Sequence, residues 1–165
     1  MKSIVNPVTL VVGLVVVALG IGGVFWMQKG AHVELKGSIL KVRTLSLEEK
    51  STVAVVDFRF ANPSDYPFVV RKVEVFLLNA KGERIQGDAV SELDAKRLFQ
   101  YYPALGQKFN DTLVLRNKVP GRQSWDRMIA ARFSLPEAEL NTRRAIIIRV
   151  EDVDGPTSEI VEQRL

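Results

Sequence analysis

The feature that most constrains this chain is a run of twenty residues without a charged side chain, Val8 to Met27. The run holds fifteen apolar residues, four glycines and one threonine. At a rise of about 1.5 Å per residue, a helix of this length extends about 30 Å, which is the hydrocarbon thickness of a bilayer. We therefore predict a single transmembrane helix that contacts the lipid bilayer over Val8 to Met27, after an N-terminal tail (1–7) and before a linker (28–32).

A cleaved signal peptide is the alternative to a retained anchor. It would use Val8 to Leu19 as its hydrophobic region and Ala18-Leu19-Gly20 as its cleavage site. The chain then continues for seven more residues without a charge, and Trp26 lies where indole rings collect at a membrane interface. These two features favour the retained anchor.

The side of the membrane is indicated by the charges that flank the run. Lys2 precedes it, whereas Lys29, Lys36, Lys41 and Arg43 come after it, which by itself places the domain in the cytoplasm. Three of the four later charges fall in the first predicted strand, and long translocated domains are largely indifferent to charge. A span near an N-terminus also resembles signal-anchors, which export the domain attached to them. We therefore expect a bacterial-type inner (plasma) membrane protein with an extracytoplasmic C-terminal domain.

Composition after the run excludes several classes of function. Of the 23 Lys and Arg residues only Lys2 precedes Gln28, so 22 basic residues stand against 19 acidic ones in the remainder. That balance does not indicate a nucleic-acid binder, which needs clustered basic residues. The sequence has no cysteine and one histidine, His32, so it offers no Cys/His nucleophile pair and no His/Cys metal site. We expect no enzyme, cofactor, metal or small-molecule substrate.

From Val33 onward, apolar residues recur with a period of two, which is typical of strands. Even-numbered residues of the run Thr52–Ala61 are expected to be buried, and the odd-numbered ones become polar toward its end. The strand candidates, in chain order, are a first strand that starts at Val33, carries Lys36, Lys41 and Arg43 and has a bulge at Gly37–Leu40, followed by Thr52–Ala61, Phe68–Leu78, Glu83–Val90, Thr112–Val119, Met128–Phe133, Ala145–Val153 and Ser158–Gln163. Short strands between turns, without βαβ alternation, predict an all-β fold over 33–165, an antiparallel immunoglobulin- or fibronectin-like sandwich. Two of the runs, 68–78 and 83–90, are predicted to form a hairpin.

One segment, 91–106, departs from the strand pattern. Ser91-Glu92-Leu93-Asp94 is typical of a capped helix start, so we predict an inserted helix of two to three turns. Its apolar side chains are expected to cover one open end of the sandwich: Leu93, Leu98, Tyr101 and Tyr102. Four rings gather here and are candidate partner-binding residues: Phe99, Tyr101, Tyr102 and Phe109. The alternative is that the rings only plug the sandwich, and burial of all four would exclude a binding site.

Short motifs carry a resemblance to a known family. They are an alternating strand that ends in Asn62-Pro63, a loop with Pro67, a strand from Val69 to Leu77, Gly82 in a turn, and Val119-Pro120-Gly121 before a strand that Phe133 and Pro136 follow. They resemble the water-stress and hypersensitive-response domain of late-embryogenesis-abundant proteins and its membrane-tethered bacterial relatives. The resemblance implies a fibronectin-like sandwich without catalytic residues that binds or protects other molecules at a membrane. Ser91 to Gly106 departs from the family pattern.

These observations together predict a single-pass, membrane-anchored and non-enzymatic β-sandwich. Its expected role is to bind a protein partner as an accessory or assembly factor of the cell envelope. A desiccation- or stress-protective module of the late-embryogenesis-abundant type is the alternative.

Overall fold

The computed structural model describes residues 7–28 and 34–163, which belong to two compact units, Met1–His32 and Val33–Leu165. Of the predicted tail (1–7), the structure describes only Pro7. Of the predicted linker (28–32), it describes only Gln28, so His32 lies outside the described residues.

The first unit contains one helix, α1 (Pro7–Gln28), of 22 residues. The helical conformation expected for Val8–Met27 is therefore confirmed. Its described side chains, those of residues 11–23, are all exposed. Over the described residues, no helix is both long and apolar enough to cross a membrane. The membrane span stays a prediction.

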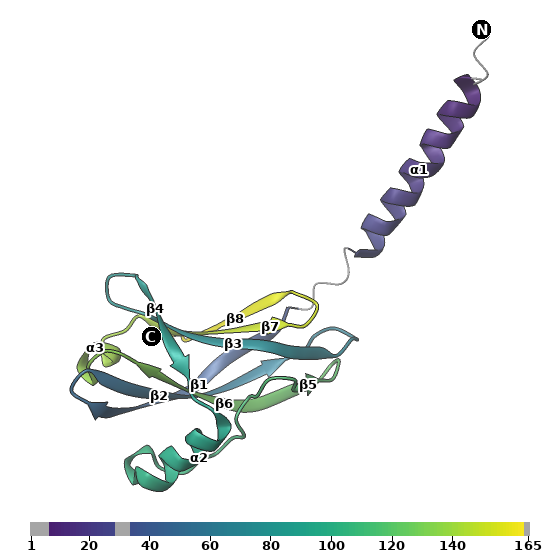
Figure 1. Cartoon of the computed structure of the whole chain (residues 1–165). Coiled ribbons are helices and arrows are strands. Elements are labelled where there is room, and N and C mark those ends of the chain that lie inside the picture. The colour runs from purple at the N-terminus through teal and green to yellow at the C-terminus, as the bar shows by residue number, and fades with distance from the viewer. Residues whose placement is uncertain (1–6, 29–33, 164–165) are drawn as a thin grey trace. The chain divides into compact units, whose positions relative to one another are not determined.

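The second unit is built mostly from antiparallel strands (Figure 1). Within residues 34–163 the strands are β1 (Lys36–Glu48), β2 (Ser51–Ala61), β3 (Phe68–Leu78), β4 (Arg84–Ala89), β5 (Lys118–Val119), β6 (Ser124–Phe133), β7 (Ala145–Asp152) and β8 (Thr157–Val161). Their order in the sheet is β1-β2-β6-β4-β3-β7-β8, and β5 pairs with β3. The three short helices of this region are α2 (Glu92–Tyr101), η1 (Pro103–Leu105) and α3 (Glu137–Asn141).

The strand β4 joins the two halves of this sheet. Its first part pairs with β3, as at Gly87 opposite Val75, and its last two residues pair with β6, as at Asp88 opposite Arg132. The sheet curls so that β3, β7 and β8 lie over β1, β2 and β6 (Figure 1). The all-β antiparallel prediction is confirmed. An immunoglobulin- or fibronectin-like sandwich is not confirmed, because β4 makes one continuous sheet where that fold has two.

The main core lies between the two halves of the curled sheet. Both halves contribute its largest buried side chains, which include Phe58 and Phe60 from β2, Phe68 from β3 and Phe133 from β6. Phe58 and Phe60 stack with ring centroids 5.6 Å apart. The even-numbered face of β2 is therefore buried as predicted, because removal of these rings from water is the main favourable term in folding such a domain.

Seven of the eight predicted strands are present, although β1 spans Lys36–Glu48 and β6 begins at Ser124, before the predicted Met128. Phe68–Leu78 and the run after it form a hairpin, and a register shift between Ile39 and Lys41 confirms the bulge in the first strand. The predicted strand Thr112–Val119 is wrong, since only Lys118–Val119 is a strand and Thr112 makes an isolated bridge to Met128. Local backbone geometry explains this, because Arg116 has a φ of 65° and the Asn117 side chain accepts a hydrogen bond from the Val114 amide.

The outer face of β3, β7 and β8 is charged and solvated. Glu159 accepts hydrogen bonds from Arg84 and Arg149, whose guanidinium also lies over the Phe76 ring. The hydrogen bond from Arg84, followed by that from Arg149, holds the pKa of the Glu159 carboxyl below its ordinary value. Charged side chains that pair with one another in this way are typical of a sheet face in contact with solvent.

The segments that carry the family resemblance meet in space. The buried amide of Asn62 donates to the carbonyls of Tyr66, Val119 and Pro120. Gly121 lies so close to Asp65 that an added Cβ would be 2.5 Å from the Asp65 carbonyl oxygen. The residues of these motifs therefore have a structural role at one junction of the fold, and the family resemblance itself stays a prediction.

The passage of β4 between the two halves depends on Gly87. A Cβ at this position would lie 2.7 Å from Cζ of the buried Phe133 ring. We expect Gly87→Ala to lower the free energy of unfolding by about 1–3 kcal/mol, since overpacking a core has that cost. Urea unfolding of Gly87→Ala, Phe133→Leu and the double variant measures it. If the double variant loses as much as the sum of the two single losses, the clash is not the cause.

Candidate partner-binding site

The inserted helix begins where the sequence indicated. Ser91 is the N-cap of α2, and its side chain accepts a hydrogen bond of 3.1 Å from the Asp94 amide. The Ser91 hydroxyl also donates to the Asp94 carboxylate at 2.7 Å. The prediction of one short helix inside 91–106 is thus confirmed, and η1 completes the segment.

The insertion covers a sheet face, which corrects the expectation that it closes an open end. The helix α2 lies on the outer side of the half of the sheet that β1, β2 and β6 form (Figure 1). Ala95 and Leu105 are buried in a second apolar cluster with Val53 and Val55 of β2. The odd-numbered residues of β2 are apolar in its first half because this helix covers them. Leu93, by contrast, is 59% exposed and takes no part in the cover.

A buried ion pair holds the insertion to the sheet. Arg43 of β1 bonds Asp57 of β2 at 2.7 Å, and their side chains are 9% and 4% exposed. The same guanidinium donates to the carbonyls of Leu105 and Gln107, each at 2.7 Å. Asn110 donates a further hydrogen bond of 2.9 Å to Asp57, whereas Nε of Arg43 is buried without a partner among the described residues. One arginine on the sheet therefore fixes the end of η1 and the loop after it.

Two predicted ring residues pack on this arginine. The Arg43 guanidinium carbon lies 5.0 Å from the Phe99 ring centroid and 5.4 Å from that of Phe109. The Lys41 ammonium lies 5.8 Å from the Phe109 centroid. Cation–π contacts of this length stabilise the rings at their positions. Arg43, which the ion pair with Asp57 holds, therefore supports the rings of Phe99 and Phe109.

The four predicted rings do not share one environment. Phe99 is half-buried against the second apolar cluster, and Tyr102 is 39% exposed. Tyr101 and Phe109 are 75% and 64% exposed. Because two rings are largely in solvent, the plug interpretation does not account for them, and their role as a binding site stays a prediction.

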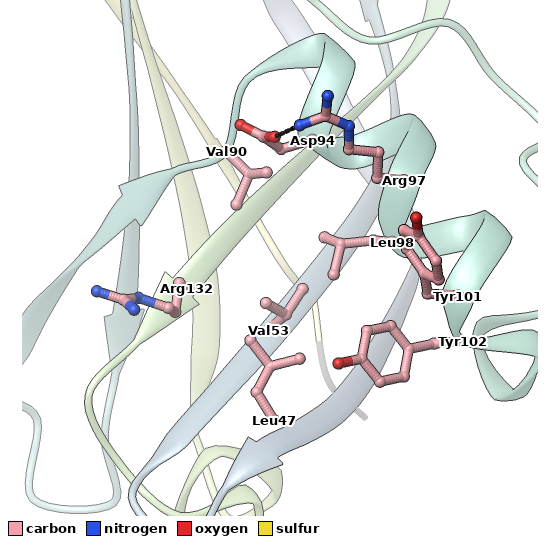
Figure 2. Close-up of a pocket in the computed structure, with 9 residues that line it drawn as sticks. All are labelled: Leu47, Val53, Val90, Asp94, Arg97, Leu98, Tyr101, Tyr102 and Arg132. Atoms are coloured by element: carbon pink, nitrogen blue, oxygen red, sulfur yellow. Dashed lines mark hydrogen bonds and ion pairs between the residues drawn. The ribbon is translucent and has the colours of Figure 1, made fainter.

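A groove of about 460 Å³ lies between α2 and the outer face of the sheet (Figure 2). Its floor is aliphatic, and the ring of Tyr102 extends across it toward Leu47 and Val53 (Figure 2). Tyr101 lies at the C-terminal end of α2, on the same wall of the groove as Leu98. Its charged members are Asp94, Arg97 and Arg132.

Both arginines of the groove are paired with an aspartate. Arg97 bonds Asp94 at 3.2 Å, so this pair has no net charge. Arg132 lies 3.8 Å from Asp88, a pair in which both side chains are more than half exposed. Solvent screens such a pair strongly. The groove therefore combines an apolar floor with two tyrosines, and each of its charged side chains lies within ion-pair distance of an opposite charge.

Several residues of this site are not evident from the sequence. Leu47, Val53 and Val90 lie in or beside strands, and nothing in the sequence marks them as members of a site. In the sequence, Arg43 stands out only as one of the positive charges after the predicted membrane span. One signal is present, since Asp57 interrupts the apolar run of β2 and a buried carboxylate requires a partner. Within residues 7–28 and 34–163 no group of three or more histidine, aspartate and glutamate side chains is placed to hold a metal ion.

Comparisons with known proteins give no family. No family model matches the chain, and no curated protein matches it in sequence. Among solved structures, the chain is similar to the archaellum periplasmic stator protein FlaG from Sulfolobus acidocaldarius, with 12% identity, a TM-score of 0.37, and coverage of 77% of this chain and 98% of that one. It is also similar to the Iho670 flagellar-like filament, with 12% identity, a TM-score of 0.33, and coverage of 95% and 98%. Likenesses at this level carry no argument about function.

The ion pair of Arg43 and Asp57 generates a prediction. Arg43→Met leaves a buried carboxylate without its counter-charge, so we expect the free energy of unfolding to fall by about 3 kcal/mol. Amide hydrogen exchange in 99–111 should accelerate, since the insertion loses its anchor. Arg43→Met with Asp57→Leu should recover most of the stability. The control is Arg59→Met, which breaks the exposed pair with Asp126 and should change little. Equal losses for the two arginines would contradict the assignment.

Proposed function

We propose that this chain is a membrane-anchored accessory protein whose β domain binds another protein through the surface of α2 and the loop after η1. The observation that carries the proposal is the exposure of Tyr101 and Phe109 on an insertion that a buried arginine fixes in place. The domain would act by binding, without catalysis.

Three features of this surface support a binding role. Tyrosine and phenylalanine are favoured anchors at protein interfaces, because each buries a large area with few rotatable bonds. Leu93 adds a third large apolar side chain that is more than half exposed. The support from Arg43 keeps Phe109 in place before a partner arrives, which lowers the entropy cost of association.

The anchor is supported by the sequence. Twenty residues without a charge, Val8–Met27, match the hydrocarbon thickness of a bilayer. Ten of the residues 8–21 are valine, leucine or isoleucine, and the transfer of these side chains into lipid is favourable. The domain after this anchor would lie on the extracytoplasmic side of the plasma membrane.

The membrane side can be tested with two fusions to the C-terminus. Alkaline phosphatase fused there should be active, because this enzyme folds only after export, and a green fluorescent protein fusion should be dark when exported through the general secretory route. The control is the phosphatase fusion of a chain that lacks residues 1–28, which should be inactive. A fluorescent green-protein fusion together with an inactive phosphatase fusion would reverse the proposed orientation.

The binding surface can be tested by photo-crosslinking in intact cells. A photoreactive phenylalanine in place of Tyr101 should form a discrete adduct with another protein. Tyr66 is the matched control, because it is 70% exposed on the loop between β2 and β3, and the same replacement there should give no such adduct. Phe109→Ala should abolish the adduct from position 101, since both rings belong to the proposed surface. Equal adducts from positions 66 and 101 would count against the proposal.

A further inference from the structure

The chain enters the β domain at one end of the curled sheet, where β1 begins and Lys36 pairs with Ala61 at the end of β2. Three connections between strands lie at this end, which we call the entry end: 62–67 between β2 and β3, 114–117 before β5, and 153–156 between β7 and β8. The connections at the opposite end are 49–50, 79–83 and 134–144. The exposed side chains of the two ends can therefore be compared.

The three connections of the entry end are neighbours in space. The Val153 amide donates to the Val69 carbonyl at 3.0 Å, and the Arg116 amide donates to the Val70 carbonyl at 2.7 Å. The connection 62–67 leads directly into β3 at Phe68. The connections therefore surround the first residues of β3.

Each connection of the entry end exposes one large apolar side chain. Tyr66 is 70% exposed, Leu115 is 61% exposed and Val153 is 47% exposed. Among the described residues of the opposite end, no large apolar side chain in a connection is exposed. Exposed apolar side chains are unfavourable in water, and their concentration at one end of a domain indicates a contact surface.

The charges of the entry end are nearly balanced. Arg122 is paired with Asp65 at 2.8 Å. Some exposed charged side chains make no ion pair with another described residue, and they are Lys36, Arg116, Lys118, Glu34 and Asp154. Three of these are basic and two are acidic. A surface with this balance does not select an anionic partner, and its long basic side chains can extend past an apolar contact into a polar layer.

The proposed membrane anchor identifies the surface that the entry end meets. Only the five residues 29–33 lie between α1 and Glu34, the first described residue of the domain. Five residues extend over at most about 18 Å. With α1 in the bilayer, this tether keeps the bilayer at a high effective concentration for the entry end.

We infer that the entry end of the β domain contacts the lipid bilayer, with Tyr66, Leu115 and Val153 in its interfacial layer. This inference rests on the proposed membrane anchor. Tyrosine is favoured at membrane interfaces because its ring is apolar and its hydroxyl is polar, while the leucine and valine side chains gain by leaving water. The proposed protein-binding surface is separate, since Tyr101 and Phe109 belong to the insertion.

The test uses single-cysteine variants of the full chain, which itself has no cysteine. Each variant carries one bimane fluorophore and is reconstituted in phosphatidylcholine nanodiscs that contain a lipid with a nitroxide quencher close to the headgroup. Fluorophores in place of Tyr66, Leu115 and Val153 should be quenched. Fluorophores in place of Lys50 and Lys81, in the turns of the opposite end, should keep their fluorescence. A fluorophore in place of Leu19, with the nitroxide near the end of the acyl chain, reports the anchor separately.

A pair of double variants shows whether the apolar side chains cause the contact. Leu115→Ser with Val153→Ser should lower the quenching at position 66 about threefold, because it removes apolar area from the interface. The matched control is Leu40→Ser with Val161→Ser, which removes similar side chains, 51% and 44% exposed, outside the entry end and should leave the quenching unchanged. All four side chains are at least partly in solvent, so the fold should tolerate both changes.

The outcomes separate the contact from the anchor. Quenching at position 19 without quenching at 66, 115 and 153 would overturn the inference and leave the anchor in place. Equal quenching at positions 50 and 66, or no effect of the serines at 115 and 153, would also overturn it. An unquenched fluorophore at position 19 would exclude the anchor, and the inference would fail with it.

Discussion

The attachment of the insertion to the sheet depends on the ion pair between Arg43 and Asp57. Both groups are buried, and removal of charges from water is costly unless each is bonded on several sides. Here Asp57 also accepts a bond from Asn110, and Arg43 bonds two backbone carbonyls of the insertion. These bonds form only when the sheet and the insertion are both in place, and even then Nε of Arg43 is buried without a partner among the described residues. Replacement of Arg43 by lysine would not preserve these bonds, since one ammonium lacks the geometry of the guanidinium.

This dependence explains the composition of the outer face of β2. Val53 and Val55 lie under α2 and are fully buried, Asp57 lies at the edge of the cover, and Arg59 lies beyond it in solvent. The gradient from apolar to charged residues along one strand matches the extent of the insertion. Within residues 34–163, the outer face of β3, β7 and β8 carries charged side chains that bond one another. The outer face of β2 therefore packs against a helix, whereas the outer face of β3, β7 and β8 is occupied by ion pairs.

The sequence predicted those parts of the fold that depend on local interactions. Alternation of apolar residues located most strands, because each side chain in a strand faces the opposite side from its neighbour. The Ser91 to Asp94 pattern located the start of α2, because a cap is formed within four residues. Alternation failed at Thr112–Val119, where the backbone of Arg116 and the side chain of Asn117 turn the chain. The five-residue helix α3 was also not predicted, since its length is too short for a helical period to show.

The sites were less predictable because they depend on contacts between distant segments. The rings of 99–109 were recognised as a candidate surface, since they are close in sequence. Their support was not, because Arg43 lies more than fifty residues away from them. A cavity of about 550 Å³ beside β3 was missed altogether, and its walls come from strands and loops that the sequence separates by up to about sixty residues. The alternation of apolar residues in β3 does not indicate where β4 stops pairing with it.

The groove and the cavity have a common origin in the path of β4. This strand has six residues, too few to fill the space beside β3 and also extend along β6. It ends at Ala89, and α2 begins two residues after Val90. Val90 lines the groove on one side and the cavity on the other, while its amide donates to the Ala130 carbonyl at 2.8 Å. A single short connection thus forms a wall of both openings. Arg43 holds the end of η1 and the loop after it through the Leu105 and Gln107 carbonyls, so the insertion that forms one wall of the groove depends on a residue of β1.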